Sequence, residues 1–189
     1  MSELRRDPIV GRWVIVDVDD PKKPSDFHVE PHHYDDPANC PFCYGNEFMT
    51  PGEIQAFRHE KTQVNAAGWM VRAIPNKFPA LQIEGSLDRR GLGIFDMSNG
   101  IGAHEVIIET PFHTKDIPDL ELNKIEMILE MYSLRSKDLE KDRRFKYVMI
   151  FKNYGHAAGA TIDHNHTQLI ALPMIPKNVL EEITGATEY

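Results

Sequence analysis

The sequence predicts an α+β fold in which a mostly antiparallel β-sheet is flanked by helices. Short runs rich in β-branched and aromatic residues recur along the chain, and irregular polar segments separate them. One long segment, residues 119–141, carries the apolar spacing of an amphipathic helix. The length of 189 residues is enough to bury a real core, and we expect residues 1–189 to form a single domain.

The N-terminal part of the chain is expected to hold a hairpin and then separate strands. The hairpin strands are expected at residues 8–10 and 13–16, on either side of a Gly-Arg turn. A polar loop that contains prolines follows and runs to about residue 39. Further strands are expected at residues 69–74 and 103–109, and a proline closes each of them.

The C-terminal part is expected to begin with the helix of residues 119–141, which Asp119 would cap. The apolar stripe of this helix is predicted to comprise Leu122, Ile125, Ile128, Leu129 and Tyr132. A strand at residues 145–151 should pair with another at residues 164–172 across a loop of small residues. Pro176 should start a short terminal helix.

Composition and charge exclude several classes of protein. The chain is 41% hydrophobic and contains no apolar run of about 18 residues, so we expect no membrane span. Its net charge of −8 argues against a protein that binds nucleic-acid backbones, which needs a basic patch. The N-terminal eight residues have no apolar core after their charges and do not resemble a secretory signal. We therefore expect a cytoplasmic protein.

The two cysteines lie in one motif, Cys40-Pro41-Phe42-Cys43, with polar loop sequence on both sides. A structural disulfide is not expected without a secretion signal. A thioredoxin-like redox pair normally opens a helix, which this context does not favour. A loop with this spacing commonly presents two thiolates to zinc, and the metal then needs two more ligands, often histidines.

The richest segment runs from Asn153 to Gln168, where a loop of small residues leads into a polar triplet. On a strand, His164, His166 and Gln168 would point to the same face because they are two residues apart. A neutral imidazole can act as a nucleophile, a base or a metal ligand. Two of them beside an amide and a glycine-bearing loop indicate chemistry on a phosphate. The alternative is a solvated polar edge strand.

Taken together, the motifs of the chain resemble the N-terminal half of the galactose-1-phosphate uridylyltransferase family, a branch of the histidine-triad superfamily. The resemblance extends over nearly the whole chain, and its specificity comes from the order and spacing of the matching segments. It is also close to the ADP-glucose phosphorylase branch, whose members, like this chain with Asn165, lack a proline between the two histidines. The matching segments are Arg6–Trp13, Cys40–Cys43, Pro75–Leu81, Gly102–Val106, Thr110–His113 and Asn153–Gln168.

This resemblance implies a mechanism in which a nucleoside monophosphate is carried on a histidine, and the matching residue is His166. Gln168 would donate a hydrogen bond to a phosphate oxygen, where charge accumulates in the transition state. The loop would contribute backbone N–H groups and a hydroxyl to the same phosphate, and an amide to phosphate or ribose. The loop residues concerned are Asn153, Gly159, Ala160 and Thr161.

The resemblance also implies a zinc site and further substrate contacts. The four metal ligands would be Cys40, Cys43, His113 and His164, and a closed set of four protein ligands indicates a structural zinc. Asn76, Lys77 and Phe78 fall where the family builds its nucleotide pocket, with burial in the core as the alternative for Phe78. Lys23 stands where the family commonly carries an arginine that reaches the phosphates of a neighbouring subunit. The other histidines are expected to be solvated, except His104 and His156, which lie near matched motifs.

The implied activity is nucleotidyl transfer of the UDP-glucose:hexose-1-phosphate uridylyltransferase type, part of galactose metabolism. UMP would move between a nucleoside-diphosphate sugar and a hexose 1-phosphate. The alternatives are an ADP-sugar phosphorylase or adenylyltransferase, and a non-catalytic zinc-containing nucleotide-binding domain. The family has a second, similar half, and we expect it to be absent after Tyr189. Because family active sites are shared between subunits, we expect a homodimer.

Overall fold

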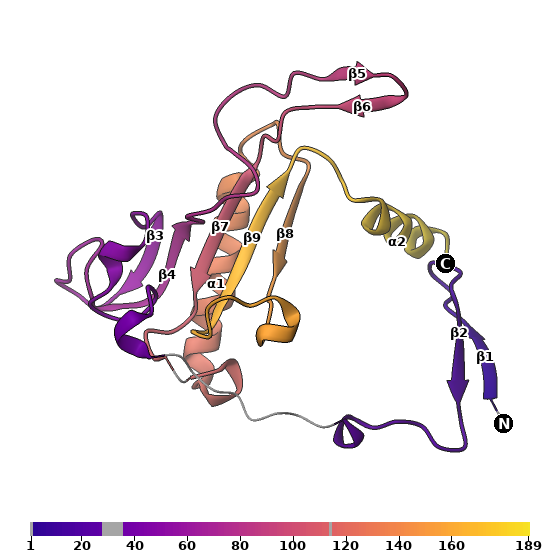
Figure 1. Ribbon diagram of the computed structural model, residues 1–189, viewed down its shortest axis with the longest axis horizontal. Coiled ribbons are helices and arrows are strands. Elements are labelled where there is room, and N and C mark those ends of the chain that lie inside the picture. Colours follow the sequence, from indigo (N-terminus) through magenta and orange to yellow (C-terminus); the bar gives the residue numbers. More distant parts are fainter. Residues whose placement is uncertain (1, 28–35, 114) are drawn as a thin grey trace. The chain divides into compact units, whose positions relative to one another are not determined.

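The computed structural model describes residues 2–27, 36–113 and 115–189 (Figure 1). The chain divides into two compact units, one made of Met1–His32 and Ile175–Tyr189 and the other of His33–Met174. The larger unit contains every predicted site residue except Lys23. The expectation of a single domain stays a prediction.

The larger unit is built on a five-stranded antiparallel sheet with the order β3-β4-β7-β9-β8 (Figure 1). The predicted α+β class with a mostly antiparallel sheet is therefore confirmed. The strands are β3 Gln55–Arg58, β4 Trp69–Pro75, β7 Ala103–Ile108, β8 Tyr147–Phe151 and β9 His166–Leu172.

One face of this sheet packs against helix α1, Leu122–Leu139. Alternate residues of the central strands point to this face, as the period of two in a strand requires. They form one hydrophobic core with the helix, which includes Val71, Ala73, Ile107, Ile128, Met131, Leu169 and Ala171. The opposite face of the sheet carries a second cluster, in which Ile74, Val106 and Ile108 pack with Cys40, Phe42 and Cys43. The cysteine motif is thereby placed on the sheet face opposite α1.

The predicted stripe of α1 is wrong at two positions, since Leu122 is 71% and Leu129 is 58% exposed. The buried face instead contains Ile128, Met131, Arg135 and Leu139. Arg135 is buried because its guanidinium donates twice to the carboxylate of Glu105 on β7, at 2.8 Å each. A buried ion pair looks polar in a sequence, so the apolar pattern alone missed Arg135, although Ile128 is buried as predicted and Ile125 and Tyr132 are half-buried.

The start of α1 also differs from the prediction, because Glu121 and not Asp119 is the N-cap residue. Asp119 ends the short 3-10 helix η4, Ile117–Asp119, and its carboxylate accepts the Asp116 N–H at 3.2 Å. The strand around the histidines begins at His166, two residues later than predicted. His164 therefore lies in the preceding loop.

The smaller unit contains a two-stranded antiparallel sheet, β1 Ser2–Arg6 and β2 Trp13–Asp17, and helix α2, Lys177–Glu188. The second hairpin strand and the terminal helix after Pro176 are confirmed. The first strand was predicted at residues 8–10, which instead form the turn. The Asp7 carboxylate accepts the N–H groups of Ile9 and Val10 at 2.8 and 3.2 Å and so holds this turn.

A second two-stranded sheet, β5 Arg90–Leu92 and β6 Phe95–Met97, was not predicted, since strands of three residues carry almost no pattern. Short 3-10 helices complete the described chain; besides η4, they are η1 Pro24–Asp26, η2 Pro37–Asn39, η3 Glu47–Met49 and η5 His156–Ala158. Among the described residues, no helix has both the length and the apolar character that a membrane crossing requires.

Candidate metal centre and nucleophilic histidine

The Cys40–Cys43 loop is shaped by local hydrogen bonds. The Asp36 carboxylate caps η2 by accepting the Ala38 N–H at 3.0 Å. The Asn46 side-chain amide donates to the carbonyl of Cys40 at 2.8 Å, and the Cys43 N–H donates to the same carbonyl at 3.3 Å. These bonds turn the chain so that both thiols face inward, where Cys40 and Cys43 are buried.

The two thiols meet two histidines that are far away in sequence. The candidate ligand atoms of Cys40, Cys43, His113 and His164 all lie within 4.8 Å of one another. Cys43 Sγ is 3.3 Å from His113 Nδ1 and 3.4 Å from His164 Nδ1, and Cys40 Sγ is 3.6 Å from His164 Nδ1. A tetrahedral zinc with Zn–S of about 2.3 Å and Zn–N of about 2.0 Å separates sulfur and nitrogen ligands by about 3.5 Å. These four side chains therefore fit a zinc ion.

The protonation state of His164 suits a metal ligand. His164 Nε2 donates to the carbonyl oxygen of Thr110 at 2.6 Å, so Nδ1 keeps a lone pair for a ligand bond. Burial lowers the pKa of His164 to about 4, which keeps the imidazole neutral. Burial and the neighbouring Cys40 raise the pKa of the Cys43 thiol to about 12, and a bound cation is what would stabilise the thiolate form.

His166 opens β9 two residues after His164, and its ring is held in one orientation. His166 Nδ1 donates to the carbonyl oxygen of His164 at 2.8 Å. The ring of Phe42, from the cysteine loop, packs edge-on against His166 with centroids 5.2 Å apart. Burial lowers the pKa of His166, so the neutral imidazole is favoured. With the proton on Nδ1, Nε2 carries a lone pair, as a nucleophile requires.

Gln168 stands two residues further along β9, on the same face as His166. Its side-chain oxygen lies 2.7 Å from His104 Nε2 and 3.5 Å from Asn76 Nδ2. Asn76 follows β4, so three adjacent strands of the sheet contribute to this group. The structure thus brings together the predicted residues Gln168 and Asn76.

Lys152 follows β8 and supports the backbone of His166. Its ammonium donates to the carbonyl oxygen of His166 at 3.2 Å and to the buried carboxylate of Glu109 at 2.6 Å. It also contacts the side-chain oxygen of Asn165. Sequence reasoning did not identify Lys152 or Glu109, because their role depends on which strands are neighbours.

We expect Lys152→Met to lower the free energy of unfolding by roughly 2–3 kcal/mol, because it leaves a buried carboxylate without its cation. Glu109 would retain only the hydroxyl donors of Tyr132 and Thr167. Lys141→Met is the matched control, since the Lys141 side chain is 77% exposed and its change should cost about 0.5 kcal/mol or less. Chemical denaturation measures both variants, and equal small losses would contradict the supporting role of Lys152.

Comparison with known proteins decides the family. Residues 1–176 match the family described as galactose-1-phosphate uridyl transferase, N-terminal domain. The chain belongs to the galactose-1-phosphate uridyl transferase family. It is 34% identical to ADP-glucose phosphorylase from Arabidopsis thaliana, over 99% of this chain and 53% of that protein. It is 30% identical to galactose-1-phosphate uridylyltransferase from Thermotoga maritima, over 100% of this chain and 52% of that protein.

A crystal structure of an ADP-glucose phosphorylase from Arabidopsis thaliana, with bound ADP-glucose, has a TM-score of 0.76 to this chain at 32% identity. The alignment covers 100% of this chain and 54% of that structure. The predicted resemblance to the galactose-1-phosphate uridyl transferase family is confirmed. The chain spans about half the length of the curated relatives it matches.

The loop of residues 153–161, which the family resemblance predicts to bind phosphate, is held by hydrogen bonds within itself. The N–H groups of Gly159 and Ala160 donate to carbonyls within the loop, at 2.9 and 3.2 Å. Gly155 and Gly159 have φ of +75° and +86°, which favours glycine at both positions. Asn153 is half-buried. The phosphate contacts of this loop stay a prediction.

Thr161 lines a cavity of about 380 Å³ beside the candidate metal centre. Cys40 and His113 line the same cavity, together with Asp36, Asn39, Pro41, Ile162 and Asp163. Thr161 therefore lines the same cavity as two of the candidate metal ligands. Its contact with a substrate phosphate stays a prediction.

The remaining substrate-binding residues predicted from the family resemblance are exposed; they are Lys23, Lys77 and Phe78. Phe78 is 83% exposed, so burial in the core, the alternative for this residue, is wrong. Lys77 is exposed and its ammonium lies 3.4 Å from the carbonyl of Met49. Lys23 is exposed in the smaller unit. His59 is exposed as expected, whereas His28, His32 and His33 lie outside the described residues.

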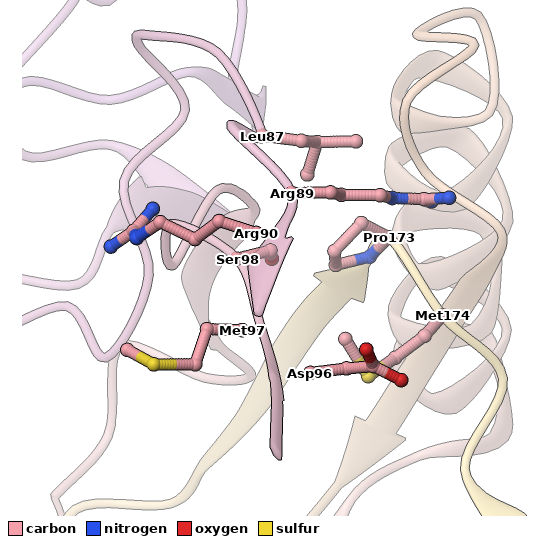
Figure 2. Close-up of a pocket in the computed structure, with 8 residues that line it drawn as sticks. All are labelled: Leu87, Arg89, Arg90, Asp96, Met97, Ser98, Pro173 and Met174. Atoms are coloured by element: carbon pink, nitrogen blue, oxygen red, sulfur yellow. The ribbon is translucent and has the colours of Figure 1, made fainter. Parts of the chain in front are cut away.

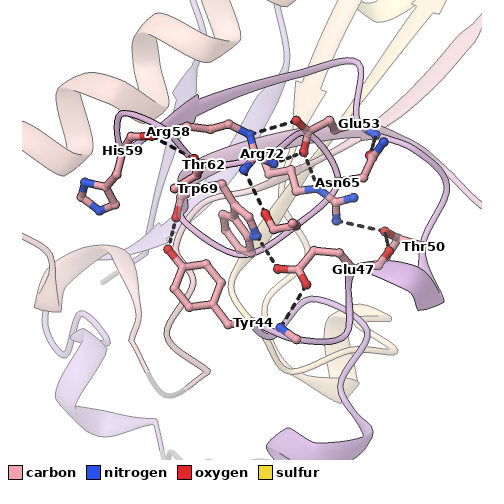
Figure 3. A network of polar contacts seen from close by, with 12 residues as sticks. Tyr44, Glu47, Thr50, Glu53, Arg58, His59, Thr62, Asn65, Trp69 and Arg72 are labelled. Atoms are coloured by element: carbon pink, nitrogen blue, oxygen red, sulfur yellow. Dashed lines mark hydrogen bonds and ion pairs between the residues drawn. The ribbon is translucent and has the colours of Figure 1, made fainter.

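A polar network supports the chain that follows the cysteine loop (Figure 3). The Glu47 carboxylate accepts the indole N–H of Trp69 at 2.9 Å and the Gly45 N–H at 3.0 Å. Arg72 on β4 donates to Glu53 at 3.1 Å and to the Thr50 hydroxyl at 2.9 Å. These bonds attach residues 44–53 to β4, so the network has a structural role.

A cavity of about 630 Å³ lies at the other end of β9, where Pro173 and Met174 follow the strand (Figure 2). Leu87 and Arg89 extend toward Pro173, whereas Arg90 and Met97 extend to the opposite side (Figure 2). No histidine or cysteine is among the described residues that line it. The described lining of this cavity therefore offers no imidazole and no thiol.

Proposed function

We propose that this chain accepts a nucleoside monophosphate from a nucleoside-diphosphate hexose on Nε2 of His166 and passes it to an acceptor phosphate. The observation that carries the proposal is the 2.8 Å hydrogen bond from His166 Nδ1 to the His164 carbonyl oxygen. This bond fixes the proton on Nδ1 and leaves Nε2 as the nucleophilic atom. His166 is half-buried, and its alternation with Thr167 and Leu169 along β9 places it on the sheet face opposite α1.

In the first step, the Nε2 lone pair attacks the α-phosphorus of the nucleotide sugar. An N–P bond forms while the bond from this phosphorus to the hexose-1-phosphate oxygen breaks, and the leaving group keeps the electron pair. The imidazole ring is positively charged in the adduct, and its Nδ1–H still donates to the His164 carbonyl. In the second step, an oxygen of the acceptor phosphate attacks the same phosphorus, and the N–P electron pair returns to Nε2.

Two further features support the proposal. The Gln168 side-chain oxygen is engaged by His104, so its amide N–H groups are available for a non-bridging phosphate oxygen. Cys40, Cys43, His113 and His164 would hold a zinc ion whose role, with four protein ligands, is to stabilise the fold. A structural metal would fix the loop of His164, whose carbonyl orients His166.

The first candidate reaction is uridylyl transfer from UDP-glucose to a hexose 1-phosphate, as the names of the uridylyltransferase relatives indicate. The second candidate is adenylyl transfer from an ADP-sugar. It is favoured by the similarity to an ADP-glucose phosphorylase and by Asn165, which stands between the two histidines in place of a proline. In this chain the Asn165 side chain contacts the ammonium of Lys152.

The proposal is tested by incubating the protein with UDP-glucose and with ADP-glucose in separate reactions and measuring the intact mass. We expect a mass increase of one nucleoside monophosphate with at least one sugar, and the sugar that reacts identifies the nucleobase. Unchanged mass with both sugars would overturn the transferase proposal in favour of a non-catalytic zinc-containing nucleotide-binding domain.

We also propose that the protein is a homodimer in which Lys23 reaches the phosphates bound to the partner subunit. Lys23 is exposed, and its backbone N–H donates to the Asp26 carboxylate at 2.8 Å, which holds the turn that presents it. Light scattering at high micromolar concentration should give the mass of two chains. A monomer under these conditions would contradict this assembly.

A further inference from the structure

His104 and Gln168 lie on the same face of the sheet, on neighbouring strands. Strands β7 and β9 lie side by side in the sheet (Figure 1). In this antiparallel pair, Gln168 stands opposite Val106 and His104 stands opposite Ile170. The two residues are therefore diagonal neighbours, a relation in which long side chains reach each other. His104 Nε2 and Gln168 Oε1 are 2.7 Å apart.

The backbone fixes which nitrogen of His104 carries the proton. The Ala80 N–H donates to His104 Nδ1 at 3.1 Å, so Nδ1 must hold a lone pair. In the neutral ring the proton is then on Nε2, which makes His104 a hydrogen-bond donor to Gln168 Oε1.

Asn76 reinforces the same arrangement. Its side-chain oxygen accepts the Phe78 N–H at 2.9 Å, which directs its amide nitrogen toward the site. This nitrogen can donate to Gln168 Oε1, which lies 3.5 Å away; its 3.1 Å approach to His104 Nε2 joins two donors and is not a hydrogen bond when Nε2 carries the proton. The His104 ring and the Asn76 side chain are therefore both directed at the oxygen of Gln168. The backbone N–H of Asn76 also donates to the backbone carbonyl of His104 at 2.8 Å, which holds the two residues together.

We propose that His104 is a positioning residue that sets the orientation of the Gln168 amide. With its oxygen held by His104, Gln168 presents N–H donors to a negatively charged phosphate. Without His104 the amide can rotate by half a turn and present its carbonyl oxygen, which repels the phosphate. This inference rests on the proposed transfer to His166, and it assigns to His104 a role that acts only through Gln168.

Two substitutions of His104 test the roles of its two ring nitrogens separately. His104→Gln places an amide nitrogen near the position of Nε2 and keeps a donor to Gln168. His104→Asn reaches only the position of Nδ1, so it keeps a partner for the Ala80 N–H but loses that donor. The rate of adduct formation is measured in single turnover over a range of nucleotide-sugar concentrations, for both variants and the wild type.

We expect His104→Asn to lower the maximum rate by about 10- to 100-fold, as the loss of a transition-state donor does, with little change in the half-saturating concentration. His104→Gln should stay within about fivefold of the wild type. Gln168→Ala should slow transfer by roughly 100-fold, and adding His104→Asn to it should slow transfer no further, because both changes remove one interaction.

Several results would overturn the role of His104. A His104→Asn variant with wild-type rates would do so. A His104→Asn change that slows the Gln168→Ala variant as much as it slows the wild type would also do so, because it would indicate a merely structural role. Nitrogen-15 NMR of the imidazoles tests the tautomer without any turnover: the proton of His104 must be on Nε2, and a proton on Nδ1 contradicts the inference. A wild type that forms no adduct refutes the proposed transfer itself and, with it, this role, whatever the tautomer.

Discussion

Replacing His166 by glycine is expected to abolish covalent nucleotide labelling while leaving metal content and secondary structure unchanged. The reason is that His166 Nε2 is the attacking atom in the proposed reaction, whereas the four candidate metal ligands are other residues. His164 is not positioned to replace it, since its Nδ1 lies 3.6 Å from the Cys40 thiol and 3.4 Å from the Cys43 thiol. Intact-mass measurement after incubation with the reactive nucleotide sugar should show no adduct, and circular dichroism should show a wild-type spectrum.

His156→Gly is the matched control for this variant. His156 is another histidine of the same segment, but it is exposed in the short helix η5 and was left unassigned by the sequence. Its replacement should leave labelling within a few-fold of the wild type. Retained labelling in His166→Gly, or loss in both variants, would contradict the role of His166 as nucleophile.

Removing the metal is the second change with a large expected effect. We expect one zinc per chain, and its removal by a chelator should lower the free energy of unfolding by about 5 kcal/mol or more, because structural zinc contributes folding energy directly. Such a loss is comparable with the whole stability of a typical domain, so partial or complete unfolding should follow. Elemental analysis and thermal unfolding, with and without chelator, measure the two effects.

Single substitutions test the same centre. Cys40→Ser and His164→Ala should lose zinc and most of the soluble protein, because each removes one of four buried ligands. His59→Ala should retain both, since His59 is exposed. Carefully purified protein without metal, or a disulfide between Cys40 and Cys43, would contradict the zinc assignment.

The fold could be predicted from the sequence where the pattern is local. Pro75 marks the end of a strand, and the alternation of β9 is visible in the residues after His166. The face of α1 could be predicted only in part, because Arg135 is buried through an ion pair with Glu105 on strand β7. Strands β5 and β6 could not be predicted either, because each has only three residues.

Part of the candidate site could likewise be predicted from local sequence, and part could not. The cysteine pair indicates a metal from its own spacing, but nothing local connects it to His113, which is 70 residues from Cys43. Only the family resemblance identified that ligand. The partnership of His104 with Gln168 depends on the pairing of β7 with β9, which the sequence does not specify. If that pairing had been known, His104 could have been identified from its position diagonal to Gln168.

The most direct test of the account is to locate the adduct. The wild-type protein is incubated with the reactive nucleotide sugar, digested under conditions that preserve the acid-labile N–P bond, and sequenced by fragmentation mass spectrometry. The account predicts one nucleoside monophosphate on His166, released when the acceptor phosphate is added. An adduct on any other residue, or one that the acceptor does not release, would contradict it.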